Sequence, residues 1–317
     1  MSKVQASMGE RQGLQSVRSR VFDSARWQDY RPRSNDIIIA TYSKCGTTWM
    51  QRIVSMLVFG SAEPRQIWDL SVWPDMRLAG PVEELWATAD AQEHRRFFKT
   101  HLPFDALPTG NGVKVIHVAR DGRDAALSLH NHLYNFTPDV LAALDEISRH
   151  DPKFGDAYPR TPESPAEFFS RWIASEEYDG QGDPAASFFQ LENSYWTVRD
   201  QPNLLLVHYA DLKRDLTGGM RRVAEFLDIA IADELWPEVV EAAGFVAMQR
   251  QGDQLIPALR MLWGSEGAKR FFNKGGNGRW RGAFNEGDLK SYDAKVRQAF
   301  SPDLAAWIEH GDAEEPD

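Results

Sequence analysis

The stretch DIIIATYSKCGTTWM, residues 36–50, determines the fold class. It begins with an unbroken, mainly β-branched run, Ile37–Ala40, which is typical of a strand buried on both faces of a parallel sheet. A short polar loop follows over Ser43–Thr48, and apolar residues then recur at helical spacing over Trp49–Val58. Strand, small-residue loop and helix in this order predict an α/β fold with a central parallel sheet flanked by helices.

The loop after this strand carries groups suited to an anion. The first N–H groups of a helix have no intrahelical partner, and the helix dipole is positive there. Gly46 allows close approach of the backbone, Thr47 and Thr48 add hydroxyl donors, and Lys44 adds a full charge. The lysine precedes the only glycine, whereas a Walker loop requires GxxxxGK[ST], so an ordinary ATP or GTP hydrolase is disfavoured. The alternative interpretation is a plain strand-to-helix turn.

Length and composition favour one large domain. The chain has 317 residues, of which 42% are hydrophobic and 11 are tryptophan, enough for a substantial core. The sequence has no clear linker and no internal repeat, so we expect a single domain over residues 1–317. The polar lead-in, residues 1–33, is expected to be flexible or partly helical, and the acidic tail, residues 311–317, is expected to be flexible.

Charge and cysteine content restrict the partners and the compartment. The formal net charge of −10 argues against general nucleic-acid binding. No apolar run approaches the roughly 20 residues that cross a bilayer, and the N-terminus lacks the apolar core of a secretory signal. The single cysteine, Cys45, excludes an internal disulfide and fits a cytoplasmic protein. No cluster of metal-ligating side chains is apparent, so no catalytic metal is expected.

Two further predicted strands end in cationic residues. Phe97–Phe98 precedes Lys99 and His101, which share one face of an extended chain and form a plausible catalytic pair; the alternative is a surface histidine. The strand Val113–Ala119 leads into a turn over Arg120–Asp124 and then a helix. Open parallel sheets bind ligands beyond the carboxyl ends of their strands, so these groups are expected in one site. On that helix, His130 and His132 lack a third metal ligand and are interpreted as packing residues.

The second half of the chain supplies a third strand, over Asn203–Tyr209, and a basic loop over Lys269–Arg281. The loop gathers five cations and three glycines in an acidic chain, which suits closure on a phosphate; a solvated basic turn is the alternative. A tryptophan-rich segment, residues 66–96, and a proline-rich insert, residues 131–183, are candidates for the wall and lid of a pocket. Helices are expected over residues 165–177, 187–199, 220–227 and 237–248.

Taken together, four segments resemble the cytosolic-type sulfotransferases, which have a fold related to P-loop kinases. The loop Tyr42–Trp49 is similar to the family's 5′-phosphosulfate loop, YPKSGTTW, and Phe98–Pro103 is similar to its FKTHLP segment. The segment Val118–Ser128 is similar to the 3′-phosphate motif, and the glycines after Lys274 are similar to the RKG…G..W signature. The four segments occur in the family's order between about residues 36 and 290.

The resemblance implies a sulfuryl donor, 3′-phosphoadenosine 5′-phosphosulfate (PAPS), and transfer to a hydroxyl or amine. His101 would be the general base, and Lys44 and Lys99 would stabilise charge on the transferred group and the leaving phosphate. Trp49 would stack on adenine, and Phe189 falls where an adenine-pocket tyrosine is common. The implied nucleotide-binding residues are Lys44, Cys45, Gly46, Thr47, Thr48, Trp49, Arg120, Ser128, Phe189, Phe245, Met248, Phe271, Asn273, Lys274 and Gly275.

Two departures from the family pattern have consequences. Asn273 replaces the arginine of the RKG triplet, so one charged 3′-phosphate contact is expected to be missing unless Arg270 or Arg279 compensates. Residues 281–290 do not reproduce the family's dimer motif, which puts the usual homodimer in doubt. Aromatic-rich segments suggest a small apolar or aromatic acceptor, with lipid and carbohydrate acceptors open. The alternatives are a nucleotide kinase with a degenerate P-loop and a non-catalytic nucleotide-binding protein.

Overall fold

Parallel strands form the centre of the molecule in the computed structural model, which describes residues 14–110, 112–174, 188–273 and 275–312. Within these ranges the sheet has five strands in the order β2-β3-β1-β4-β5, and all neighbours pair in parallel. This confirms the predicted α/β class. The strands are β1 (Ile37–Thr41), β2 (Ser71–Val72), β3 (Phe97–Thr100), β4 (Lys114–Ala119) and β5 (Leu204–His208).

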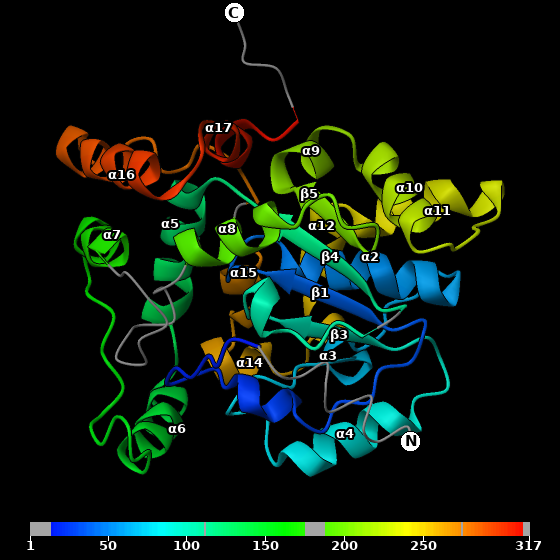
Figure 1. Cartoon of the computed structure of the whole chain (residues 1–317), viewed down its shortest axis with the longest axis horizontal. Helices are drawn as coiled ribbons and strands as arrows, with labels where there is room; N and C mark the ends of the chain where they lie inside the picture. The colour runs from blue at the N-terminus through cyan, green and yellow to red at the C-terminus, as the bar shows by residue number, and fades with distance from the viewer. Residues whose placement is uncertain (1–13, 111, 175–187, 274, 313–317) are drawn as a thin grey trace, which may run out of the picture.

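The central strand β1 is buried on both faces, as its apolar run predicts. Successive side chains of a strand point to opposite faces, and the two sides of β1 accordingly belong to different hydrophobic clusters. Ile37 and Ile39 pack with α2 (Thr47–Phe59), α10 (Leu216–Phe226) and α11 (Trp236–Ala243). Ile38 and Ala40 pack in the larger cluster on the other face. The sheet is therefore the middle of three layers (Figure 1).

The larger cluster is covered by helices from across the chain. They include α5 (Gly122–Tyr134), α7 (Pro165–Ala174), α8 (Phe188–Thr197), α16 (Glu286–Ala299) and α17 (Pro302–His310). Further elements are η1 (Ser24–Trp27), α3 (Ile67–Leu70), α4 (Val82–Ala91), η2 (Phe104–Ala106), α6 (Pro138–Arg149), α9 (Tyr209–Arg214) and η3 (Asp233–Leu235). Within the described ranges, no helix combines the length and apolar character needed to cross a membrane.

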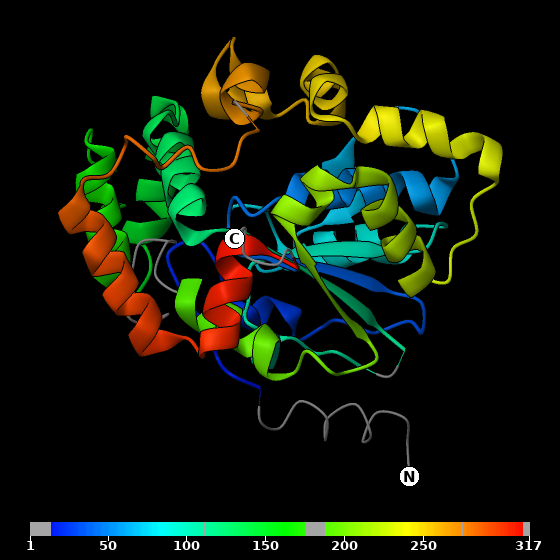
Figure 2. The same cartoon turned by 90° about the horizontal axis from the view of Figure 1, so that it is seen from above.

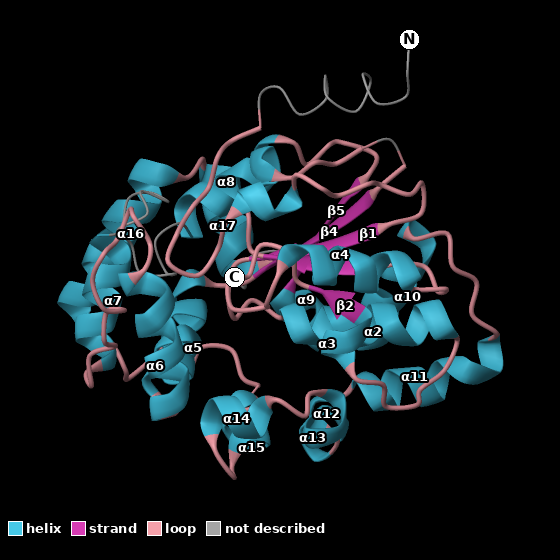
Figure 3. Ribbon diagram, turned by 90° about the horizontal axis from the view of Figure 1, so that it is seen from below, coloured by secondary structure: helices cyan, strands magenta, loops and turns pink. Residues whose placement is uncertain are grey.

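A row of short helices lies beyond one side of the sheet. It consists of α12 (Phe245–Arg250), α13 (Gly252–Leu255), α14 (Leu259–Trp263) and α15 (Gly267–Phe271). Figures 2 and 3 show this row running from α11 back toward α5. It has its own small core, which includes Met248, Leu259 and Trp263. The sequence predicted one continuous helix over residues 237–248, but the extended backbone of Gly244 separates α11 from α12.

Two expectations about irregular segments need correction. The lead-in is not flexible from residue 14 onward, because Val17, Phe22 and Trp27 are buried in the main core. Apolar side chains among its charges supply this anchoring. The proline-rich insert contains a regular helix, α6, which the proline spacing concealed. Residues 1–13 and 313–317 lie outside the described ranges.

Candidate functional site

A cavity of about 930 Å³ gathers most of the predicted site residues at the carboxyl ends of β1, β3 and β4. Such a position is expected for an open parallel sheet, in which strand ends and the following loops form the binding crevice. The wall also includes residues of α12 and α15, so the row of short helices closes one side. Predicted residues in the wall are Lys44, Gly46, Thr47, Thr48, Trp49, Lys99, His101, Arg120, Ser128, Phe245, Met248, Phe271, Asn273 and Gly275.

The start of α2 forms an anion cradle, comprising Lys44 and Gly46–Thr48. The helix has no side-chain cap, so its first N–H groups are available to a ligand. Gly46 adopts φ 108°, and a Cβ there would lie 3.1 Å from the Tyr209 ring. Thr47 Oγ1 lies 2.6 Å from Thr41 Oγ1, which fixes one hydroxyl of the cradle. The backbone geometry therefore suits close approach of a phosphate or sulfate group.

Two lysines of the cavity lack carboxylate ion pairs in the described part of the chain. Burial, with a smaller contribution from Arg120, lowers the pKa of Lys44 to about 7. Burial likewise lowers the pKa of Lys99 to about 7, although nearby Asp75 opposes the shift. The Lys99 ammonium lies 3.5 Å from the centre of the Trp73 ring, an interaction that does not neutralise its charge. A bound anion would stabilise both charged forms.

His101 directly follows β3 and lines the cavity. It contacts Thr41, which is hydrogen-bonded to the anion cradle, and also two aromatic side chains of the cavity wall. Its Nδ1 is 2.7 Å from the carbonyl oxygen of Thr41, a contact in which Nδ1–H donates. The basic lone pair is then on Nε2. The ring packs against Phe22 and Trp73 at centroid distances of 5.5 and 5.1 Å. Burial, followed by the charge of Lys99, holds the pKa of His101 well below its usual value, so the imidazole is neutral and can accept a proton.

Arg120 connects the cradle to the basic loop. Its guanidinium donates to the carbonyl oxygens of Lys44 and Gly276 at 3.2 and 2.8 Å. The Nε of Arg120 is buried and has no partner among the described residues. An unpaired buried guanidinium nitrogen is costly, and a phosphate oxygen is a suitable partner for it.

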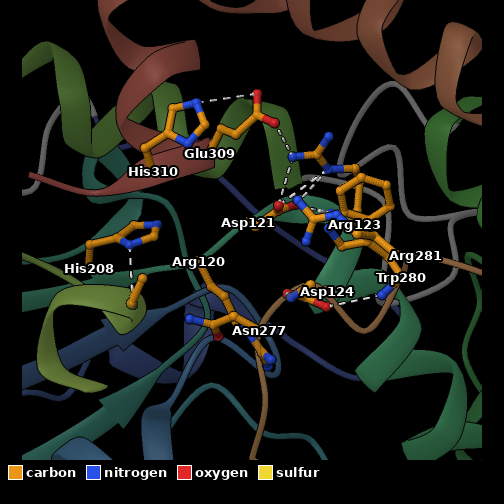
Figure 4. A pocket seen from close by; sticks show the side chains of 12 residues that line it. Arg120, Asp121, Arg123, Asp124, His208, Asn277, Trp280, Arg281, Glu309 and His310 are labelled. Atoms are coloured by element: carbon orange, nitrogen blue, oxygen red, sulfur yellow. Dashed lines mark hydrogen bonds and ion pairs between the residues drawn. The ribbon is translucent and has the colours of Figure 1, made fainter. Parts of the chain in front are cut away.

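Asp124, on the first turn of α5, fixes the basic loop beside Arg120. Its carboxylate accepts hydrogen bonds from the backbone N–H groups of Gly278 and Arg279 at 2.6 and 2.9 Å. Figure 4 shows Asp124 beside Trp280 and close to Arg120. A small pocket of about 120 Å³ lies behind this contact. The loop is therefore anchored by a buried carboxylate rather than held only by its own glycines.

Several predicted residues do not reach the cavity. The Cys45 side chain is buried beneath the loop, and burial raises the pKa of its thiol. Phe189 lies in the main core, with its ring 5.5 Å from Trp172 and 5.3 Å from Phe300, and is not part of the cavity wall. Lys274 lies outside the described residues. Of the two candidates to replace the missing arginine at Asn273, Arg279 lines the cavity and Arg270 does not.

Tyr209 is an aromatic residue of the cavity wall that the sequence interpretation did not single out. It follows β5 directly, lines the cavity and packs edge-on against Trp49 at 5.2 Å. The Arg120 guanidinium lies 4.4 Å from the centre of its ring. The sequence could have identified Tyr209, because it is the last residue of the predicted strand Asn203–Tyr209 and ligands bind at the carboxyl ends of such strands.

His132 is the second residue that the sequence interpretation missed. It was interpreted as a packing residue together with His130, but only His132 lines the cavity. Its Nδ1 lies 3.3 Å from Lys44 Nζ. The two positions are separated by about 200° around a helix, because each residue turns about 100°, and they therefore face in opposite directions.

Comparisons with known proteins agree with this geometry. The family profile described as "Sulfotransferase domain" matches residues 34–302. The chain is 36% identical to a glycolipid sulfotransferase of Mycobacterium bovis, covering 93% of this chain and 94% of the relative. It is 28% identical to mouse sulfotransferase 1B1 over 87% of this chain and 86% of that protein.

Solved structures show the same fold. Retinol dehydratase in a complex with retinol and PAP matches with a TM-score of 0.68 and 20% identity, over 93% of this chain and 89% of that chain. Mouse sulfotransferase SULT7A1 complexed with PAP matches with a TM-score of 0.64 and 19% identity, over 90% and 91% of the two chains. With its sheet, its site and the profile match over residues 34–302 in agreement, the chain belongs to the sulfotransferase family.

Proposed function

We propose that this chain transfers a sulfuryl group from PAPS to a hydroxyl of an amphiphilic acceptor that has an apolar body. The observation that carries the proposal is the composition of one cavity. It combines an anion cradle at the start of α2 with an apolar chamber, and His101 contacts both, through Thr41 and through Phe22 and Trp73. Charge stabilisation and a neutral base are thus adjacent to a hydrophobic binding surface.

The donor would be held by the anion cradle together with Arg120 and Ser128. The unpaired Nε of Arg120 and the hydroxyl of Ser128 would meet the 3′-phosphate, and the N–H groups at Thr47 and Thr48 would meet the 5′-phosphate. Trp49 and Tyr209, whose rings contact each other edge-on at 5.2 Å, would together form an aromatic surface for the adenine. When bound, the donor supplies the electrophilic sulfur and a phosphate leaving group.

The residues around the cradle account for the remaining chemistry. As the acceptor oxygen bonds to sulfur, its proton moves to Nε2 of His101, and the bond between sulfur and the 5′-phosphate oxygen breaks. The Thr41 carbonyl keeps the imidazole in the tautomer required for this step. Lys44 and Lys99 stabilise the negative charge that develops on the leaving phosphate and the sulfuryl oxygens. Positioning and charge stabilisation provide most of the catalysis in transfers of this type.

The acceptor chamber has a largely apolar wall. Residues of the packed lead-in, α5, α6, the connection between these two helices, and α14 contribute to it: Val21, Phe22, Leu129, Leu133, Phe136, Val140, Leu144, Leu262 and Trp263. Such a wall favours a hydrocarbon or ring system over a fully polar acceptor. The relative from Mycobacterium bovis, a glycolipid sulfotransferase, supports an acceptor that joins a polar head to an apolar body.

Transfer of radiolabelled sulfate from PAPS tests the proposal. We expect label in 1-dodecanol and dodecyl glucoside, and much less in glucose, because glucose cannot bury apolar surface in the chamber. If glucose is labelled as efficiently as dodecyl glucoside, the apolar acceptor is wrong. If no acceptor is labelled and PAP does not bind, the donor assignment is wrong as well.

Proton uptake on nucleotide binding follows from the two lysines. Their pKa values near 7 leave both largely neutral at about pH 8, and a bound dianion would raise these pKa values, so about one proton per lysine is taken up. Affinity should weaken as the pH rises above about 7, because the charged lysines bind the anion. Calorimetry at about pH 8 in Tris and in HEPES measures the uptake through the difference in buffer ionisation enthalpy. Equal enthalpies in the two buffers would contradict the prediction.

The aromatic neighbours of adenine can be tested with one matched pair of variants. Tyr209→Leu should weaken PAP binding by about 5- to 150-fold, because stacking on a base contributes about 1–3 kcal/mol. Phe189→Leu should leave the dissociation constant unchanged and lower the melting temperature, since Phe189 packs in the core. Calorimetric titration and thermal melts of both variants distinguish the two positions. A loss of affinity in the Phe189 variant alone would support the original sequence interpretation.

A further inference from the structure

Two imidazoles line the cavity, and their hydrogen bonds give them opposite properties. His101 uses Nδ1–H to donate to the Thr41 carbonyl, so it presents a lone pair at Nε2. When Lys44 is charged, as a bound anion would keep it, its ammonium can only donate, so His132 accepts at Nδ1, 3.3 Å away. The hydrogen of neutral His132 is therefore on Nε2. One ring is prepared to accept a proton, and the other to donate a hydrogen bond.

His132 is held in this state by its surroundings. Its ring packs against both Trp263 and Phe136, with centroid distances of 4.6 and 5.2 Å. Burial, followed by the charge of Lys44, keeps the pKa of His132 well below its usual value, so the ring is neutral. In the described part of the chain, no group is hydrogen-bonded to Nε2, and the residue lines the cavity. A donor in a mostly apolar chamber needs a ligand acceptor to replace its water contacts.

The Nε2–H group of His132 lies near the groups proposed to act in sulfuryl transfer. Lys44, which His132 contacts, is part of the anion cradle, and both His101 and Lys99 interact electrostatically with the His132 ring. A bound acceptor that reaches His101 with one hydroxyl therefore lies within the same end of the cavity as His132.

We propose that His132 selects acceptors with two neighbouring oxygens: one hydroxyl gives its proton to His101, and the adjacent oxygen accepts a hydrogen bond from His132 Nε2–H. The inference rests on the proposed sulfuryl transfer and narrows its acceptor to an apolar body with a vicinal diol or sugar-like head. His132 takes no part in bond breaking. Its role is specificity, because an acceptor without the second oxygen leaves the Nε2–H group unpaired.

A matched pair of substrates isolates the second oxygen. 1,2-Dodecanediol and 1-dodecanol differ by one hydroxyl next to the reacting one. We expect kcat/KM for the diol to exceed that for the alcohol by about 10-fold in the parent enzyme, which is the value of one buried hydrogen bond. His132→Phe preserves the aromatic packing and removes the donor, so the diol-to-alcohol ratio should fall to about one, mainly through the KM of the diol.

His130→Phe provides the control on the same helix. The His130 ring faces away from the cavity, with Nε2 2.9 Å from the Pro162 carbonyl oxygen, and its replacement should preserve the ratio even if stability falls. His132→Gln retains a side-chain N–H and should recover part of the preference. The ratio is measured within each variant, so a general loss of activity cannot imitate the result.

Three outcomes would overturn the inference. Equal kcat/KM values for diol and alcohol in the parent enzyme would contradict it while leaving sulfuryl transfer established. An unchanged preference in His132→Phe would assign the selection to another residue. Failure of the parent enzyme to sulfate either compound would refute the proposed acceptor class and this inference with it.

Discussion

Replacement of His101 by glutamine is expected to lower kcat by about 10²- to 10⁴-fold, the usual contribution of a general base. Glutamine can still fill the space beside Phe22 and Trp73, but it has no basic nitrogen. The neutral imidazole is oriented by the Thr41 carbonyl, and this geometry is lost together with the base. PAP binding should change little, because His101 is not part of the anion cradle.

Steady-state rates with saturating PAPS and 1-dodecanol measure this effect, and calorimetric PAP binding confirms that the donor site is intact. His150→Gln is the control, since His150 is exposed at the end of α6. The assignment also predicts a pH profile: activity depends on neutral His101, so it is lost as the pH falls through the lowered pKa of this residue. If His101→Gln retains nearly the parental kcat with PAP bound, the base is a different group.

Replacement of Lys44 by methionine is expected to lower kcat by about 10²- to 10³-fold, as for the loss of one preorganised charge-stabilising donor. Methionine keeps the unbranched stem. Residue 44 has a left-handed backbone, with φ 71°, and methionine places there a side chain of similar length and branching to lysine. The variant removes the positive charge without changing the turn, so the effect reports electrostatics rather than loop strain.

Single-turnover rates with preformed enzyme–PAPS complex measure the chemical step directly. Lys269→Met is the control, because Lys269 is exposed and paired with Glu266 outside the cavity wall. A loss confined to KM, with the single-turnover rate unchanged, would show that Lys44 binds the donor equally in the ground and transition states. That result would contradict a role in stabilising the leaving phosphate.

The parallel sheet and the anion cradle could be predicted because they depend on local patterns. The apolar run Ile37–Ala40 specifies a strand buried on two faces, and the loop after it contains its own helix start. Lys99 and Arg120 could be assigned to the same site because each directly follows a predicted strand. Such inferences need only the rule that parallel strands end at the same edge of the sheet.

The residues that were misplaced depend on packing between distant segments. Phe189 and Tyr209 are both aromatic, but only Tyr209, at the carboxyl end of β5, lines the cavity. His130 and His132 likewise differ only in the helix face that they occupy, and the direction of that face is set by α14 and α15. The packing of the lead-in was not predicted because its few apolar side chains show no periodic pattern. They are buried only by contacts with the main core, which is formed by distant segments.

Nucleotide selectivity is the most direct test of the central claim that this site uses PAPS. Calorimetry should compare PAP with AMP, ADP and ATP, each with and without Mg²⁺. We expect PAP to bind tightly without metal and AMP to bind at least about 10-fold more weakly, because AMP lacks the 3′-phosphate proposed to pair with Arg120 Nε, which has no partner among the described residues. Preference for ATP, or a requirement for Mg²⁺, would contradict the claim and support the kinase alternative.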